Sequence, residues 1–95
     1  MANNMEFPID LEIPLVSPYS DFINDIRCRT NNMLKYQMST FGITIDRIKR
    51  IGDAESSEGK EIFIDTKTNK IIFEVRIIPE ELKAVLTYKY ESYEQ

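Results

Sequence analysis

The sequence predicts an α+β fold in which one amphipathic helix packs on an antiparallel sheet of about four or five strands. Two observations carry this prediction. Apolar residues recur with helical spacing over residues 19 to 40, and they alternate with polar residues with a period of two in several other segments. The 95 residues contain only three glycines and four prolines, so long linkers are not expected and residues 1 to 95 are interpreted as a single domain.

The first predicted element is a strand over residues 6 to 16, EFPIDLEIPLV. Apolar residues occupy its odd positions, as in a half-buried strand, whereas Pro8 and Pro14 occupy even positions. All even-numbered amides of a strand point to the same lateral edge, and proline has no amide hydrogen to donate there. Residues 1 to 16 are therefore expected to form an edge strand or an assembly arm that pairs on one side only.

Two partners are compatible with this strand. Pairing within the chain would make the prolines a guard against edge-to-edge aggregation, whereas pairing with a neighbouring subunit would make the strand an assembly arm. We favour the neighbouring subunit, because no turn connects the segment to another strand. The predicted interface on this segment consists of Phe7, Ile9, Leu11, Ile13 and Leu15.

The helix is predicted at about residues 19 to 40. Ser17 is placed as its N-cap and Pro18 at its first helical position, with Ser20 as a competing cap. Apolar side chains then follow helical spacing, and Gly42 is expected to end the helix.

The next strands follow the helix. Residues 43 to 51 are interpreted as a strand with a bulge, or as a strand that runs into an irregular turn, because the isoleucine spacing slips from two to three. Residues 60 to 78 form the clearest hairpin. In its turn, Asp65 is expected to accept hydrogen bonds from the turn amides and Asn69 to adopt the left-handed conformation.

The end of the chain is ambiguous. Residues 80 to 93 fit both a helix and a strand, and we favour a strand over residues 83 to 91. Ile72 and Ile78 are predicted on the face opposite Phe73, which would give the sheet more apolar surface than one helix covers.

The composition argues against catalysis. The sequence contains no histidine, so the commonest general base, the standard triads and most transition-metal sites are absent. Cys28 is interpreted as a small helix residue without a chemical role, because no histidine can activate it. Residues 53 to 59 are acidic, but their spacing does not match a calcium loop. No catalytic residue, cofactor or metal site is therefore predicted.

Charge is segregated along the chain. Residues 1 to 26 contain acids but no base, residues 27 to 50 are predominantly basic, and the formal net charge of the whole chain is −4. A basic segment can contact phosphate backbones, but the overall negative charge favours pairing with acidic protein surfaces. The predicted contacts with phosphate or with an acidic partner are Arg27, Arg29, Lys35, Arg47, Lys49 and Arg50.

The C-terminal segment supplies a second candidate interface. Tyrosine covers a large area and forms hydrogen bonds at its rim, which suits an interface, but a half-buried strand also uses tyrosine to close a core. Both interpretations stand. The residues concerned are Tyr88, Tyr90 and Tyr93.

These observations predict a small, non-enzymatic assembly or interaction protein that forms homo-oligomers and is a candidate component of a phage particle. One alternative is a nucleic-acid-binding regulator that uses the basic segment, and another is an inhibitor of a host or defence protein that uses its acidic surface. No membrane partner is expected, because no segment approaches the ~20 apolar residues that span a bilayer. Nothing resembles a signal peptide, so the expected location is the cytoplasm or a particle assembled there.

Overall fold

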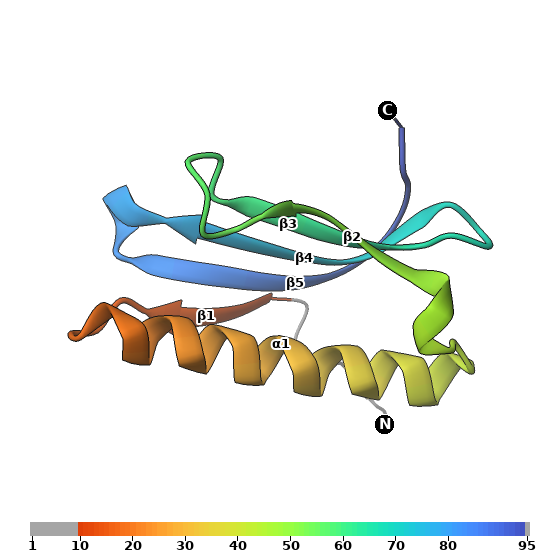
Figure 1. Cartoon of the computed structure of the whole chain (residues 1–95), viewed down its shortest axis with the longest axis horizontal. Helices are drawn as coiled ribbons and strands as arrows, with labels where there is room; N and C mark the ends of the chain where they lie inside the picture. The colour runs from red at the N-terminus through yellow and green to blue at the C-terminus, as the bar shows by residue number, and fades with distance from the viewer. Residues whose placement is uncertain (1–9, 95) are drawn as a thin grey trace, which may run out of the picture.

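One helix lies along one face of a five-stranded antiparallel sheet in the computed structural model, which describes residues 10 to 94 (Figure 1). The predicted α+β fold is confirmed. The elements are β1 (Asp10–Pro14), α1 (Tyr19–Phe41), the 3-10 helix η1 (Ile45–Arg47), β2 (Ile48–Asp53), β3 (Lys60–Asp65), β4 (Lys70–Ile78), the 3-10 helix η2 (Pro79–Glu81) and β5 (Lys83–Ser92).

The strand order in the sheet is β1-β5-β4-β3-β2. Strands β2 to β5 follow one another as an antiparallel meander, and β1 adds to the remaining side of β5. The first and last strands of the chain are therefore neighbours. Strands β1 and β2 form the two edges of the sheet.

The helix starts and ends at signals that the sequence carries, but its cap differs from the predicted one. Pro18 occupies the N-cap position with extended backbone, and its carbonyl accepts the amide hydrogen of Asp21 at 3.0 Å. The predicted Ser17 cap is wrong, because Pro18 precedes the first helical turn and no side chain caps it. At the other end, Gly42 adopts the left-handed conformation (φ 67°) and its amide bonds to the Met38 carbonyl, as in an αL cap.

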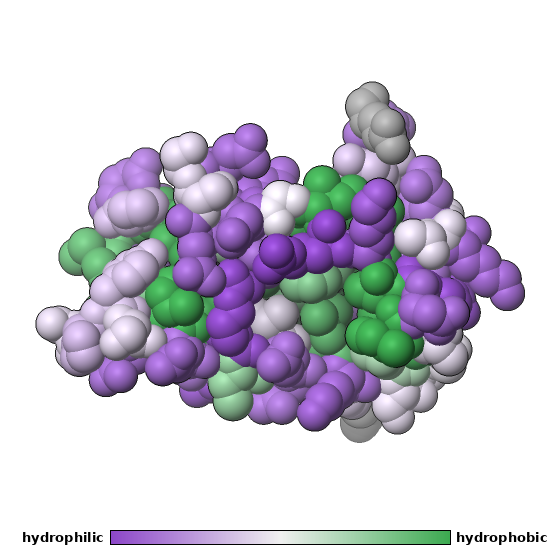
Figure 2. Space-filling view, viewed as in Figure 1, coloured by the Kyte–Doolittle hydropathy of each residue, from purple (hydrophilic) through white to green (hydrophobic). Residues whose placement is uncertain are grey.

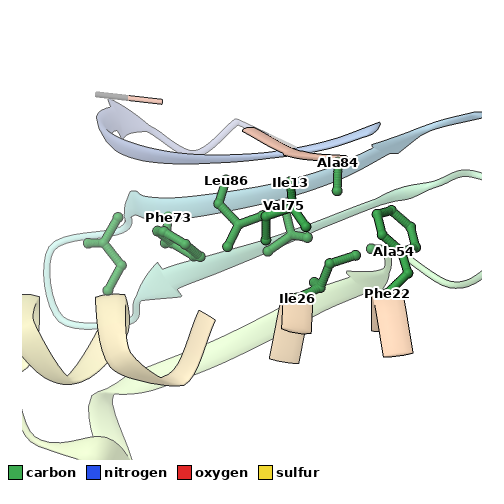
Figure 3. Packing of buried hydrophobic residues seen from close by; sticks show 9 residues of the cluster. Ile13, Phe22, Ile26, Ala54, Phe73, Val75, Ala84 and Leu86 are labelled. Carbon is green, nitrogen blue, oxygen red and sulfur yellow. The ribbon is translucent and has the colours of Figure 1, made fainter. Parts of the chain in front are cut away.

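The hydrophobic core lies between α1 and the sheet (Figure 3). Phe22 and Ile26 of α1 pack with Phe73 and Val75 of β4 and with Leu86 of β5, and each of these side chains is at most 1% exposed. Complete burial of a side chain of this size contributes about 1.5 to 3 kcal/mol relative to exposure. The same cluster includes Ile13, Ala54, Ile72 and Ala84.

Two strand predictions need correction. Ile72 does not lie opposite Phe73, because the register shifts between Ile71 and Phe73 and Ile72 joins the same buried cluster. In the segment after the helix, the irregular part comes first: η1 forms one turn, and the regular strand β2 begins only at Ile48.

The predicted hairpin turn is confirmed. The Asp65 carboxylate accepts the Lys67 amide at 3.1 Å and the Thr68 hydroxyl at 3.2 Å, and Asn69 is left-handed with φ 58°. The C-terminal segment is a strand, as favoured. It follows η2 and a left-handed Leu82 (φ 57°).

Candidate interaction surfaces

Strand β1 pairs within the chain and on one side only. It lies antiparallel to β5, with Asp10 opposite Thr87 and Pro14 opposite Lys83. Leu15 continues this register and donates its amide hydrogen to the Leu82 carbonyl at 2.8 Å, so the odd-numbered amides face β5. Pro14 therefore faces the outer edge, as predicted. Pro8 lies outside the described residues. The preference for a neighbouring subunit as the pairing partner is corrected for residues 10 to 14.

The predicted interface of the N-terminal strand lies mostly in the core. Ile13 is 3% exposed, and Leu11 and Leu15 pack against the buried cluster beneath α1. Ile13 therefore lies in the protein interior, and Leu11 and Leu15 are partly buried against it. Phe7 and Ile9 lie outside the described residues.

The three C-terminal tyrosines differ in environment. Tyr88 is half-buried, with its ring 5.7 Å from that of Phe73 and its hydroxyl donating to the Met33 carbonyl at 3.3 Å. Burial raises the pKa of Tyr88. Tyr93 is half-buried, and its amide bonds to the Asn69 carbonyl. Tyr90 alone of the three is exposed, so only this tyrosine keeps a free surface.

Most of the predicted basic contacts are paired with acids of the same chain. Ion pairs join Arg27 to Glu61 and Glu55, Arg29 to Asp25, Arg47 to Asp65, and Arg50 to Glu61 at 4.0 Å. Lys35 and Lys49 have no acidic partner among residues 10 to 94. Apart from Asp25 of α1, these acids come from the loop and strands of residues 53 to 65, and not from the N-terminal strand.

The pair of Arg27 and Glu61 is the most buried charged contact. Glu61 is fully buried on β3, where one carboxylate oxygen accepts the Ala54 amide at 2.9 Å and the other accepts Nη1 of Arg27 at 2.7 Å. Arg27 also donates to Glu55 at 2.7 Å. Burial alone would lower the pKa of Arg27, but its hydrogen bonds to Glu61 and Glu55 outweigh burial and raise it. This cluster fastens α1 to β3 and to the loop before it.

A second buried carboxylate anchors the β3–β4 turn. Nε and Nη2 of Arg47 donate to the two oxygens of Asp65 at 3.0 and 2.6 Å. This bidentate hydrogen bonding lowers the pKa of Asp65, helped by the Lys67 amide. The pair connects η1 to the end of β3.

Charged side chains lie over the sheet face that points away from α1. Glu74 is 5% exposed and pairs with Arg76 at 3.2 Å and Lys89 at 3.0 Å. An open depression of about 390 Å³ lies over these residues and Val85. The carboxylate of Glu74 is thus paired with two cations, and Asp10, which also lines the depression, accepts the Thr87 hydroxyl at 2.9 Å.

Strand β2 is the second edge of the sheet. The Thr66 amide donates to the Arg47 carbonyl at 2.8 Å. In the same antiparallel register, the backbone hydrogen bonds between β2 and β3 are made by the odd-numbered residues of β2. The backbone groups of Ile48 and Arg50 therefore point away from the sheet. No described strand pairs with them, and the exposed Lys49 and Arg50 side chains flank them.

Large apolar side chains are exposed at both ends of α1. We define the helix-start patch as Val16, Tyr19 and Leu82, which are 47% to 63% exposed. The Leu15–Leu82 hydrogen bond holds Val16 and Leu82 side by side where α1 begins, at the left of Figure 1.

The helix-end patch, at the right of Figure 1, consists of Phe41, Ile45 and Tyr90, which are 49% to 71% exposed. The rings of Phe41 and Tyr90 meet edge-on at 5.4 Å, and Ile45 opens η1 just after the helix. Figure 2 shows apolar surface toward both the left and the right of the molecule. Sequence periodicity did not identify these patches. Ile45 and Leu82 follow the apolar spacing of residues 43 to 51 and 80 to 93, whereas in the structure Ile45 lies in η1 and Leu82 is left-handed.

The charges around the two patches differ. Exposed Asp21, Glu80 and Glu81 surround the helix-start patch, where Lys83 pairs with Glu81 and with Glu12. Two exposed lysines, Lys67 and Lys70, lie in and beside the β3–β4 turn near the helix-end patch, because Thr66 of this turn is bonded to Arg47 of η1.

Residues 10 to 94 contain no group of three potential metal ligands, and the Cys28 thiol is exposed. No helix within this part of the chain is long and apolar enough to cross a membrane. Comparison of the chain with protein-family models, with curated proteins and with solved structures finds no match.

Proposed function

We propose that this chain is a small, non-enzymatic assembly protein that associates with further copies of itself. The observation that carries the proposal is the exposure of two apolar patches at opposite ends of α1. Single exposed apolar side chains are common on soluble proteins, but clusters of them mark interaction sites. Tyrosine and phenylalanine, present in these patches, are enriched at protein interfaces.

The nucleic-acid alternative has weaker support. Arg27, Arg29 and Arg47 are held by acids of the same chain, so a phosphate would have to compete with bonds that are already made. Only Lys35 and Lys49 among the predicted contacts lack an acidic partner within residues 10 to 94.

Sedimentation equilibrium tests the proposal. The average mass should rise from the monomer value of 11.1 kDa as the concentration increases from ~5 to ~500 µM, a range chosen for an interface of modest size. High salt should not abolish the association, because apolar burial is not screened as surface charges are. A mass of one chain at every concentration would contradict the proposal.

A further inference from the structure

We infer that the copies associate head to tail, with the helix-start patch of one copy packed on the helix-end patch of the next. The inference rests on the proposed self-association and specifies its geometry. The occupant of each patch is thus a second copy of this chain.

The two patches cannot satisfy each other within one molecule. A helix of 23 residues is about 34 Å long, so the patches are separated by nearly the full 38 Å extent of the protein. Water can therefore be excluded from either patch only by a partner from outside its own chain.

Charge favours contact between unlike ends. At the helix start, Asp21, Glu80 and Glu81 outnumber Lys83, so this end is acidic. Contact between two helix-start ends would bring these acids together, and like charges repel across an interface.

The helix end carries exposed charges of both signs and is not predominantly acidic. Arg47 is balanced by Asp65, and Lys89 pairs with both Glu74 and Glu91. The exposed charges that remain are Lys67 and Lys70 against Asp46 and Glu94. Contact between the helix end and the helix start therefore places lysines beside carboxylates.

The sheet edges are poor alternatives for joining identical chains. Pro14 removes an amide donor from the outer edge of β1. If two copies paired their β2 edges antiparallel around a two-fold axis near the middle of the strand, Arg50 would lie opposite Arg50 or Lys49 opposite Lys49. Like charges in directly opposed positions destabilise a sheet.

Each patch is small. Three half-exposed large side chains provide roughly 300 Å² of apolar surface, whereas a stable interface buries about 800 Å² on each partner. The association is therefore expected to be weak and concentration-dependent. Because the two surfaces differ, the contact is heterologous and builds rings or open chains of subunits.

A mixing experiment tests the inference. Leu82→Lys places a cation in the helix-start patch, and Ile45→Asp places an anion in the helix-end patch, so each substitution opposes the charge that the partner presents. Asn31→Lys and Asn31→Asp, on an exposed position of α1, provide the same charge changes away from both patches. Circular dichroism establishes that each variant is folded.

The head-to-tail contact predicts that each patch variant alone stays monomeric at the concentration where the wild type and both Asn31 variants associate. An equimolar mixture of the two patch variants should regain association, because each supplies the patch that the other lacks. Association of either variant alone would overturn the head-to-tail contact while leaving self-association intact. A mixture that stays monomeric would also overturn it, and a monomeric wild type would overturn the proposed function as well.

If either patch variant is unfolded, Val16→Lys and Tyr90→Asp replace the pair in the same mixing scheme. Both residues belong to the defined patches and are about half exposed, so their substitution removes little core packing. The same outcomes decide the inference.

Discussion

The fully buried Glu61 of β3 accepts a 2.7 Å hydrogen bond from Arg27 of α1, and this contact joins the two layers of the fold. The other oxygen of the same carboxylate bonds to the Ala54 amide, so both of its oxygens are satisfied. The contact fixes how the helix is placed on the sheet. The core packing of Phe22 and Ile26 holds the same helix against the sheet.

Arg27→Met should destabilise the protein by about 3 kcal/mol or more, because it removes the cation that is hydrogen-bonded to the buried Glu61 carboxylate and leaves only Arg50 at 4.0 Å. Urea denaturation measures this loss. Arg29→Met is the matched control, since the pair of Arg29 with Asp25 is exposed and should contribute less than about 0.5 kcal/mol. Equal effects of the two substitutions would contradict the assigned role of Glu61.

Asp65 should make stability depend on acid pH. Its pKa is lowered in the folded protein by hydrogen bonds from Arg47, whereas in the unfolded chain it titrates near the ordinary value of 3.8. Between these two pKa values the unfolded chain binds more protons than the folded protein. The stabilisation is therefore complete above the unfolded pKa and is lost as the pH falls through the folded pKa.

Denaturation curves recorded between about pH 5 and pH 2 should show this decline, and Asp65→Asn should remove the part that Asp65 contributes. Glu58→Gln, at an exposed loop position, serves as a comparison. An unchanged pH profile in Asp65→Asn would refute the assignment.

The basic side chains of β2 should protect its open edge from aggregation. Lys49→Thr combined with Arg50→Thr leaves the outward backbone groups in place but removes both charges, so light scattering should increase on prolonged incubation. Lys35→Thr removes a charge from the exposed side of α1 and should have little effect. Comparable aggregation of this control would show that net charge, and not the edge, is responsible.

Thr30→Val should stabilise the fold by about 1 kcal/mol. Thr30 is 3% exposed on α1, and its hydroxyl has no hydrogen-bond partner within residues 10 to 94, whereas valine has nearly the same shape without the polar atom. Thermal unfolding measures the gain, and Thr40→Val at an exposed helix position should change stability by less than about 0.5 kcal/mol. A loss of stability in Thr30→Val would point to a hydrogen bond from that hydroxyl.

Local patterns made the fold predictable. Residues close together in the chain set the alternation in residues 60 to 78 and the helical spacing before Gly42. The same is true of the left-handed Asn69 in its turn. The partner of β1 was not predictable in this way. Asp10 lies opposite Thr87, and no local signal specifies a contact across that sequence distance.

The buried ion pair had a sequence signal that was missed. Glu61 and Phe63 are two residues apart on β3, so their side chains point to the same face of the sheet. Because Phe63 packs on the core, alternation alone predicts that Glu61 also faces the helix. The apolar patches had a weaker signal. Leu82 and Ile45 are apolar residues at irregular positions, and only the assembled fold shows that they remain exposed.

The most direct test of the account is a cross-linking measurement in a Cys28→Ser background, which removes the native exposed thiol. One chain carries Leu82→Cys, the other carries Ile45→Cys and an isotopic mass label, and a short bismaleimide is added to the mixture. Head-to-tail association predicts a product that joins the two different chains, in clear excess over either product that joins identical chains. Products of identical chains in equal or greater yield would contradict the head-to-tail contact.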